Sequence, residues 1–211
     1  MSTNSSRLDD LKDIKTIMQQ SSRFISLSGL SGISAGLCAL AGAWYTTKKS
    51  DGRFETLVGD DGFNLQSTLL QIAVATFLAA FVLAFIFTYL RSKKTGTTMW
   101  NFTARRLMLN VAIPMAVGGI FIYKMLDFEY FELAPPACLL FYGLALVNAS
   151  KYTLGEVRYL GYGQLVLGIV NCFMIGYGLF FWAAGFGILH IVYGIVMWYK
   201  YERVNNNADL V

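Results

Sequence analysis

The most constraining feature of the sequence is its first long apolar run, from Phe24 to Thr46, because no charged residue lies between Arg23 and Lys48. A helix needs about 20 mostly apolar residues to cross the hydrocarbon core of a bilayer. This run is long enough, but only seven of its residues are Leu, Ile or Phe, which supply roughly −2 to −4 kcal/mol of insertion free energy. The run therefore predicts a spanning helix that inserts weakly on its own.

Small side chains recur one turn apart on adjoining stripes of this helix: Ser28, Gly32 and Gly36, and beside them Ser31, Ala35 and Ala39. Small residues at this spacing let a second helix backbone approach closely in a membrane. We expect Ser28, Gly32 and Gly36 to make helix-packing contacts, and we expect this helix to be the buried one around which the others pack.

The composition places the whole chain in the membrane class. Of its 211 residues, 55% are hydrophobic and 14% are charged, against about 25% charged in a soluble domain. Five further apolar runs follow, and we expect an all-α membrane protein with a six-helix transmembrane bundle over residues 24–200. The predicted later spans are 67–90, 107–126, a fourth that opens at 135–136 and ends near 148–150, 159–181 and a short last one over 186–199, with a tight turn at 183–185.

The ends of the chain are polar. Residues 1–23 have apolar side chains at helical spacing and a Ser6–Asp9 capping box, which predicts a cytoplasmic amphipathic helix that lies on the membrane or docks on another chain. Residues 201–211 are expected to form a cytoplasmic tail. An alternative is that the first run is a signal peptide cleaved near Ala39–Ala43, but Asp9, Asp10 and Asp13 are untypical of a basic leader.

The distribution of positive charge predicts the orientation. With the N-terminus inside, thirteen of the seventeen Lys and Arg residues fall in inner segments, as the positive-inside rule requires. The densest cluster is the basic loop 91–106. The predicted localisation is the bacterial inner membrane, with both termini cytoplasmic. The net charge of +4 follows from this topology and does not indicate nucleic-acid binding.

Familiar catalytic and metal-binding patterns are not supported. Gly29–Gly32 matches the GxSG motif of rhomboid proteases and His190 lies in the last span, but in that family the serine lies in a central helix and further histidines take part. A single histidine and three intramembrane cysteines offer no zinc or bis-histidine haem set. The Gly59–Gly62 segment lacks the ligand spacing of a calcium loop and predicts a turn. We expect no catalytic, cofactor or metal residues.

Three polar side chains in the last two spans are the candidate site. Gln164 and Asn171 are seven residues apart and share a helix face, and His190 is expected about one turn from the outer end of its helix. They predict either hydrogen bonds between helices or a polar path across the membrane. No Asp or Glu lies in the middle of a span, which disfavours a proton- or sodium-coupled transporter.

The segment SSRFISLSGLSGISAG, residues 21–36, resembles the opening of a family of small bacterial integral membrane proteins that have no assigned activity. The similarity covers most of the length and carries no catalytic motif. It implies the same membrane topology and leaves function open. The leading hypothesis is a non-enzymatic membrane protein that contacts a partner, either a copy of itself or a cytoplasmic protein. The alternative is a small-solute transporter or channel using Gln164, Asn171 and His190.

Overall fold

The computed structural model describes residues 28–49, 62–96 and 101–202. These residues form helices and turns and no β-strand. The predicted amphipathic helix over residues 1–23, most of the predicted turn at 59–62 and the tail beyond residue 202 lie outside the described residues.

Of the first three described helices, two extend past both ends of the apolar run that predicted them, and the first extends past the C-terminal end of its run. The three helices are α2 (Gly29–Lys49), α3 (Gly62–Thr95) and α4 (Phe102–Asp127). The start of α4 is fixed by Asn101, whose side-chain oxygen accepts a hydrogen bond from the Ala104 amide at 2.7 Å. This is the usual role of an N-cap residue, and it explains why the helix begins before the apolar part of the sequence.

The second half of the chain contains three further helices. A short 3₁₀ turn, η2 (Phe131–Leu133), leads into α5 (Ala134–Ala149), whose first turn holds Pro135 and Pro136, where proline is well tolerated. Then come α6 (Glu156–Phe173) and a continuous last helix made of α7 (Gly178–Trp182), η3 (Ala183–Leu189), α8 (His190–Met197) and η4 (Trp198–Glu202). We call Gly178–Glu202 the final helix; η3 and η4 are π-helical stretches within it.

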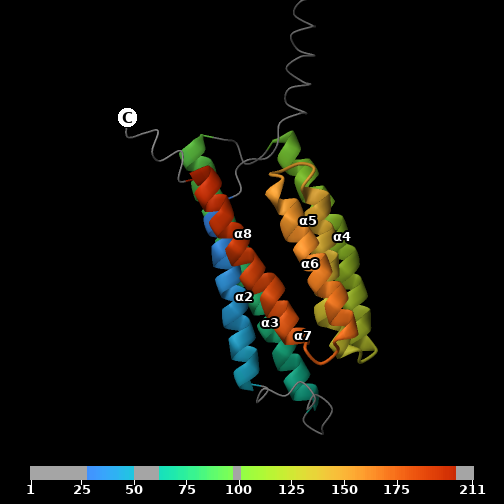
Figure 1. Ribbon diagram of the computed structural model, residues 1–211. Helices are drawn as coiled ribbons and strands as arrows, with labels where there is room; N and C mark the ends of the chain where they lie inside the picture. The colour runs from blue at the N-terminus through green and yellow to red at the C-terminus, as the bar shows by residue number, and fades with distance from the viewer. Residues whose placement is uncertain (1–27, 50–61, 97–100, 203–211) are drawn as a thin grey trace, which may run out of the picture.

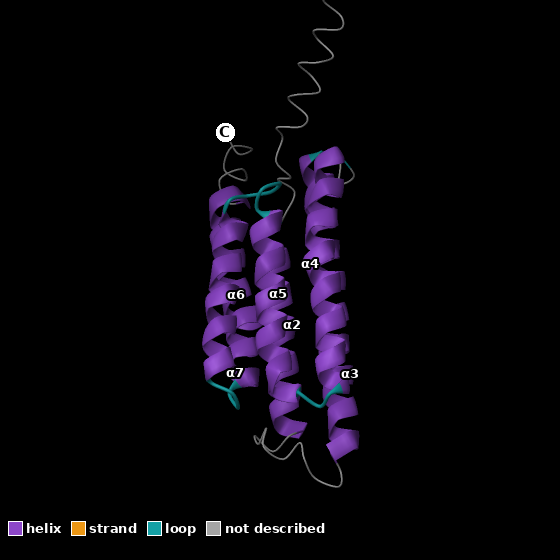
Figure 2. Ribbon diagram, turned by 90° about the vertical axis from the view of Figure 1, so that its right-hand side faces the viewer, coloured by secondary structure: helices purple, strands orange, loops and turns teal. Residues whose placement is uncertain are grey.

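The helices form two groups that are visible side by side in Figure 1. In the first group, α2 packs against both α3 and α8, and in the second, α5 packs between α4 and α6. The second group is made of helices consecutive in sequence, whereas the first joins the beginning of the chain to its end. Figure 2 shows that the long helices run roughly parallel to one another.

Glycines bring α2 and the final helix into backbone contact. A Cβ atom at Gly36 would lie 2.7 Å from the carbonyl oxygen of Gly187, and one at Gly32 would lie 3.1 Å from the Cα atom of Gly194. Ser28, just before α2, is buried, and its carbonyl accepts a hydrogen bond from the Ser31 hydroxyl at 2.5 Å. The small stripe of α2 therefore lies on the final helix, where larger side chains would hold the backbones apart.

The second group has its own close contacts. A Cβ atom at Gly143 of α5 would lie 3.0 Å from the carbonyl oxygen of Gly161 in α6. Between α4 and α5, the Asn148 side-chain amide donates to the backbone and side-chain oxygens of Asn110, both at 3.1 Å. This pair shows how an intramembrane amide is usually satisfied, by a partner on the next helix.

The predicted turn at 183–185 is wrong. The fifth helix ends at Phe173, and the chain turns between Met174 and Tyr177, where Gly176 has a φ of +99°, a left-handed conformation that glycine adopts without a Cβ penalty. Residues 183–185 are helical. Their small side chains serve packing, since a Cβ atom on Gly185 would strike Leu139 and Gln164.

The expectation that the first helix is the centre of the bundle is also wrong. One face of α2 carries exposed apolar side chains, with Leu37 56% and Trp44 61% exposed. The final helix instead contacts both groups: η3 and α8 pack on α2, while α7, η3 and α8 pack on α5 or α6. It is the element that joins the two halves of the molecule.

Four of the described helices are long and apolar enough to cross a membrane: Leu70–Lys94, Phe102–Asp127, Phe131–Ala149 and Gly178–Tyr201. The last has 24 residues, or about 36 Å at 1.5 Å per residue, so it is not the short span that the sequence predicted. Most of their large apolar side chains are exposed, which suits lipid contact. The chain is therefore an all-helical protein with the character of a membrane protein.

Candidate functional site

Three polar side chains converge at the junction between the two helical groups. Tyr142, Gln164 and His190 come from α5, α6 and the final helix. Each lies close to the middle of its helix, counted along the sequence. Gln164 is fully buried and His190 is 6% exposed. We call these three side chains and the Gly185 carbonyl the polar junction.

The Gly185 carbonyl oxygen organises the polar junction by accepting two hydrogen bonds. The Gln164 side-chain amide donates to it at 2.8 Å, and Nδ1 of His190 lies 3.0 Å from it. Because a carbonyl oxygen can only accept, Nδ1 carries the hydrogen. In the neutral imidazole Nε2 is then an acceptor, and it receives the hydroxyl of Tyr142 at 2.8 Å.

The carbonyl belongs to an irregular part of the final helix. Gly185 lies in η3, a π-helical stretch, and π segments inside α-helices frequently occur at functional sites. Aromatic rings shield the region: Phe186 lies 5.1 Å from Tyr142 and 5.1 Å from Trp182, measured between ring centroids. The polar groups of the site are thus surrounded by apolar and aromatic side chains.

Asn171 lies on the same face of α6 as Gln164 and is 1% exposed. Gly168, between them, faces Leu139 and Leu140 of α5. Neither the nitrogen nor the oxygen of the Asn171 side chain has a hydrogen-bond partner among the described residues, and the same holds for Oε1 of Gln164. The structure therefore brings Gln164 and His190 together and leaves Asn171 two turns away.

The sequence predicted Gln164, Asn171 and His190 as the candidate site. It did not predict Tyr142 or the Gly185 carbonyl, which bind two of these side chains. Tyr142 could have been noticed as the one hydroxyl within the α5 apolar run, whereas the role of the Gly185 carbonyl depends on a π-helical stretch that no side-chain pattern reveals. The expected place of His190, near the end of its helix, is wrong. Once the turn moves to Met174–Tyr177, His190 falls at mid-helix.

The other chemistry considered from the sequence finds no matching geometry. The Ser31 hydroxyl donates to the Ser28 carbonyl, while both ring nitrogens of His190 contact Gly185 and Tyr142, so Ser31 and His190 do not form a nucleophile and base pair. Cys38, Cys138 and Cys172 are free. Within the described residues, no cluster of three or more His, Cys, Asp or Glu side chains could hold a metal ion.

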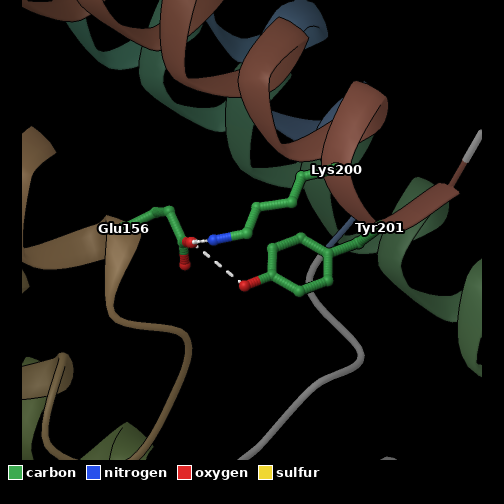
Figure 3. Close-up of polar contacts among 3 residues, drawn as sticks. All are labelled: Glu156, Lys200 and Tyr201. Carbon is green, nitrogen blue, oxygen red and sulfur yellow. Dashed lines mark hydrogen bonds and ion pairs between the residues drawn. The ribbon is translucent and has the colours of Figure 1, made fainter.

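A second polar contact ties the two groups together at the end of the final helix (Figure 3). The Lys200 ammonium donates to Oε1 of Glu156 at 2.5 Å, and the Tyr201 hydroxyl donates to the same oxygen at 3.0 Å. Glu156 is the first residue of α6, so this contact, which we call the end clasp, links the start of α6 to the last turn of the chain's helical part.

We expect Glu156→Gln to lower the free energy of unfolding by only about 0.2–1 kcal/mol, the range of exposed ion pairs, because the Lys200 side chain is 58% exposed. Thermal unfolding of the purified protein measures this. Asp127→Asn is the matched control, since it removes the Lys124–Asp127 pair within α4, and it should cost less. Equal losses in the two variants would contradict a role of the end clasp in joining separate helices.

The chain matches no protein-family model, no curated protein and no solved structure.

Proposed function

We propose that the chain is a non-enzymatic, multi-pass protein of the bacterial inner membrane, with six spanning helices, and that it acts as a transporter or channel for a small polar solute. The single observation that carries this proposal is the position of the polar junction. Tyr142, Gln164 and His190 lie at the middle of three helices and at the boundary between two helical groups.

Membrane physics supports this reading. Polar groups at mid-depth in a bilayer cost free energy and are characteristic of functional sites. Substrate sites of transporters lie near the bilayer midplane, between two sets of helices, and commonly use interrupted helices. Three features support the proposal: the polar junction lies at the middle of three helices, at the boundary between two helical groups, and at η3, a π-helical stretch within the continuous final helix.

The proposed orientation places both termini in the cytoplasm. Arg91 lies near the end of α3, and Arg105 and Arg158 lie in the first turns of α4 and α6. Figure 1 shows these helix ends on the side where α2 begins and the final helix ends, in keeping with the positive-inside rule. Reporter fusions after Asn101 and after Asn205 should report the cytoplasm, and a fusion after Gly59 should report the outside. A cytoplasmic signal at Gly59 would contradict this topology.

The function is tested by reconstituting the purified protein into liposomes and measuring solute entry by stopped-flow light scattering with urea, acetamide and glycerol. We expect entry of at least one of these solutes to be faster than in protein-free liposomes, and the Gln164→Leu variant to lose most of that increase. Entry at the protein-free rate for all three would contradict the proposal.

Contact with a partner is a second candidate function, and the exposure of α3 favours it. This helix packs chiefly against α2, and none of the residues in its most apolar stretch is buried. A second copy of the chain or another protein could cover this face, as could lipid. The mass of the protein in lipid nanodiscs and crosslinking in cells show whether a second copy, another protein or lipid covers this face. A monomer without specific crosslinks would contradict the partner-contact function.

A further inference from the structure

The amide groups of α6 that lack partners are confined to one face of one helix. Among the described residues, the buried side-chain nitrogen and oxygen atoms without a hydrogen bond are Oε1 of Gln164 and both polar atoms of Asn171. Elsewhere the Asn148 amide donates to Asn110 across α5 and α4, and the Asn110 amide donates to the Arg106 carbonyl. An unpaired amide in a membrane interior costs several kcal/mol, and buried polar groups are paired in the great majority of cases. The two exceptions therefore need an explanation specific to this face.

The surroundings of these atoms exclude a charged ligand. The three elements packed around them are α5, α6 and the final helix, and between Tyr159 and Tyr199 the sequence has no Asp, Glu, Lys or Arg; α5 has none either. Both ring nitrogens of His190 are already in hydrogen bonds. An ion at this depth would have no counter-charge, so a neutral ligand is favoured.

The hydrogen-bonding capacity of the free atoms selects the ligand further. Asn171 offers one donor group and one acceptor, and Gln164 offers an acceptor. A primary amide or urea presents a carbonyl to the Asn171 nitrogen and an N–H to its oxygen, so the two amides pair face to face. A carboxylate lacks the donor, and an ammonium ion lacks the acceptor.

The spacing shows that one small molecule cannot use both residues. Gln164 and Asn171 are seven residues apart on α6, or about 10.5 Å along the helix axis. Between them, Gly168 lies against Leu139 and Leu140, with a Cβ there meeting Leu140 at 2.9 Å. Because α5 and α6 are in close contact between the two amides, Asn171 and Gln164 are separate positions.

We propose that Asn171 and Gln164 form two successive binding positions for a small uncharged solute that carries an amide or urea group. This inference rests on the proposed function, because it names the class of solute that the polar junction handles. Asn171 forms the position nearer the turn at Met174–Tyr177, and Gln164 forms the position at mid-depth beside the Gly185 carbonyl.

The binding positions are tested by saturation-transfer NMR of acetamide with the full chain in lipid nanodiscs, observing the acetamide methyl group. Acetate, which has the same shape and a charge, is the comparison. We expect a signal from acetamide above that of empty nanodiscs and none from acetate. The double variant Gln164→Met and Asn171→Leu should lower the acetamide signal at least threefold, and the control Asn110→Leu should not.

Three results would overturn the inference: no acetamide signal with the wild-type protein, an equal signal with the double variant, or acetate binding as well as acetamide. The first of these would mean that water alone, and no amide solute, reaches these residues. Failure of the transport proposal is distinguishable. Acetamide binding without faster solute entry into liposomes would contradict transport and leave the two binding positions in place. Faster glycerol entry that is lost in Gln164→Leu, with no acetamide signal, would contradict the binding positions and leave transport in place.

Discussion

Replacing Gly36 with isoleucine is expected to lower the thermal stability of the purified protein more than any other single change considered for the helix contacts. A Cβ atom at this position would lie 2.6 Å from Cγ1 of Ile191 and 2.7 Å from the carbonyl oxygen of Gly187. Overpacking of a filled contact costs about 1–3 kcal/mol, and here part of the obstacle is backbone. The two helices would have to separate.

Insertion energy alone predicts the opposite, because isoleucine makes the weakly apolar α2 more hydrophobic. The control is Ala79→Ile on the exposed face of α3, which adds the same side chain and should be neutral. The loss of thermal stability in Gly32→Ile should lie between the losses in Gly36→Ile and Ala79→Ile. A Cβ atom at Gly32 has its nearest neighbours at 3.1–3.2 Å, and these include the movable ring of Tyr193. If Gly36→Ile proved as stable as Ala79→Ile, the α2 contact with the final helix would be disproved.

Replacing Asn171 with leucine is expected to change stability and function in opposite directions. Leucine has the same number of side-chain heavy atoms and removes a donor and an acceptor that have no partner among the described residues. Relief of a buried unsatisfied group is worth about 1–3 kcal/mol, so the unfolding temperature should rise. Solute entry into liposomes should fall, because the amide that binds the solute is gone.

Asn110→Leu is the contrasting variant. Its amide donates to the Arg106 carbonyl at 2.8 Å and accepts from Asn148, so its loss should lower stability and leave solute entry unchanged. If both variants were destabilised and both transported normally, Asn171 would be an ordinary structural residue.

The sequence predicted the helical class because apolar runs separated by charged segments leave few alternatives in a bilayer. It also singled out Gly32 and Gly36, since small residues one turn apart have a direct packing meaning, and the structure places both of them against the final helix. Which helix occupies the centre could not be predicted, because a stripe of small residues shows that a neighbour approaches and not how many neighbours there are.

The misplaced turn had the largest consequence for the site. Ala183, Ala184 and Gly185 have the composition of a turn, but small residues also suit a close helix contact, and only the position of Leu139 and Gln164 against Gly185 distinguishes the two. The true turn depends on Gly176 and its positive φ. Moving the turn from 183–185 to Met174–Tyr177 moves His190 from the expected helix end to the middle of the final helix.

The central claim is that an uncharged amide solute reaches Asn171 from water, and alkylation of an introduced cysteine tests it most directly. Cys38, Cys138 and Cys172 are first replaced by alanine, and Asn171→Cys is compared with Ala145→Cys, a fully buried position in α5. Iodoacetamide is itself a neutral amide, and iodoacetate is its charged counterpart. The account predicts that iodoacetamide labels Asn171→Cys at least tenfold faster than Ala145→Cys, that acetamide slows this reaction, and that iodoacetate does not label either variant. Equal, slow labelling of the two positions by iodoacetamide would contradict it.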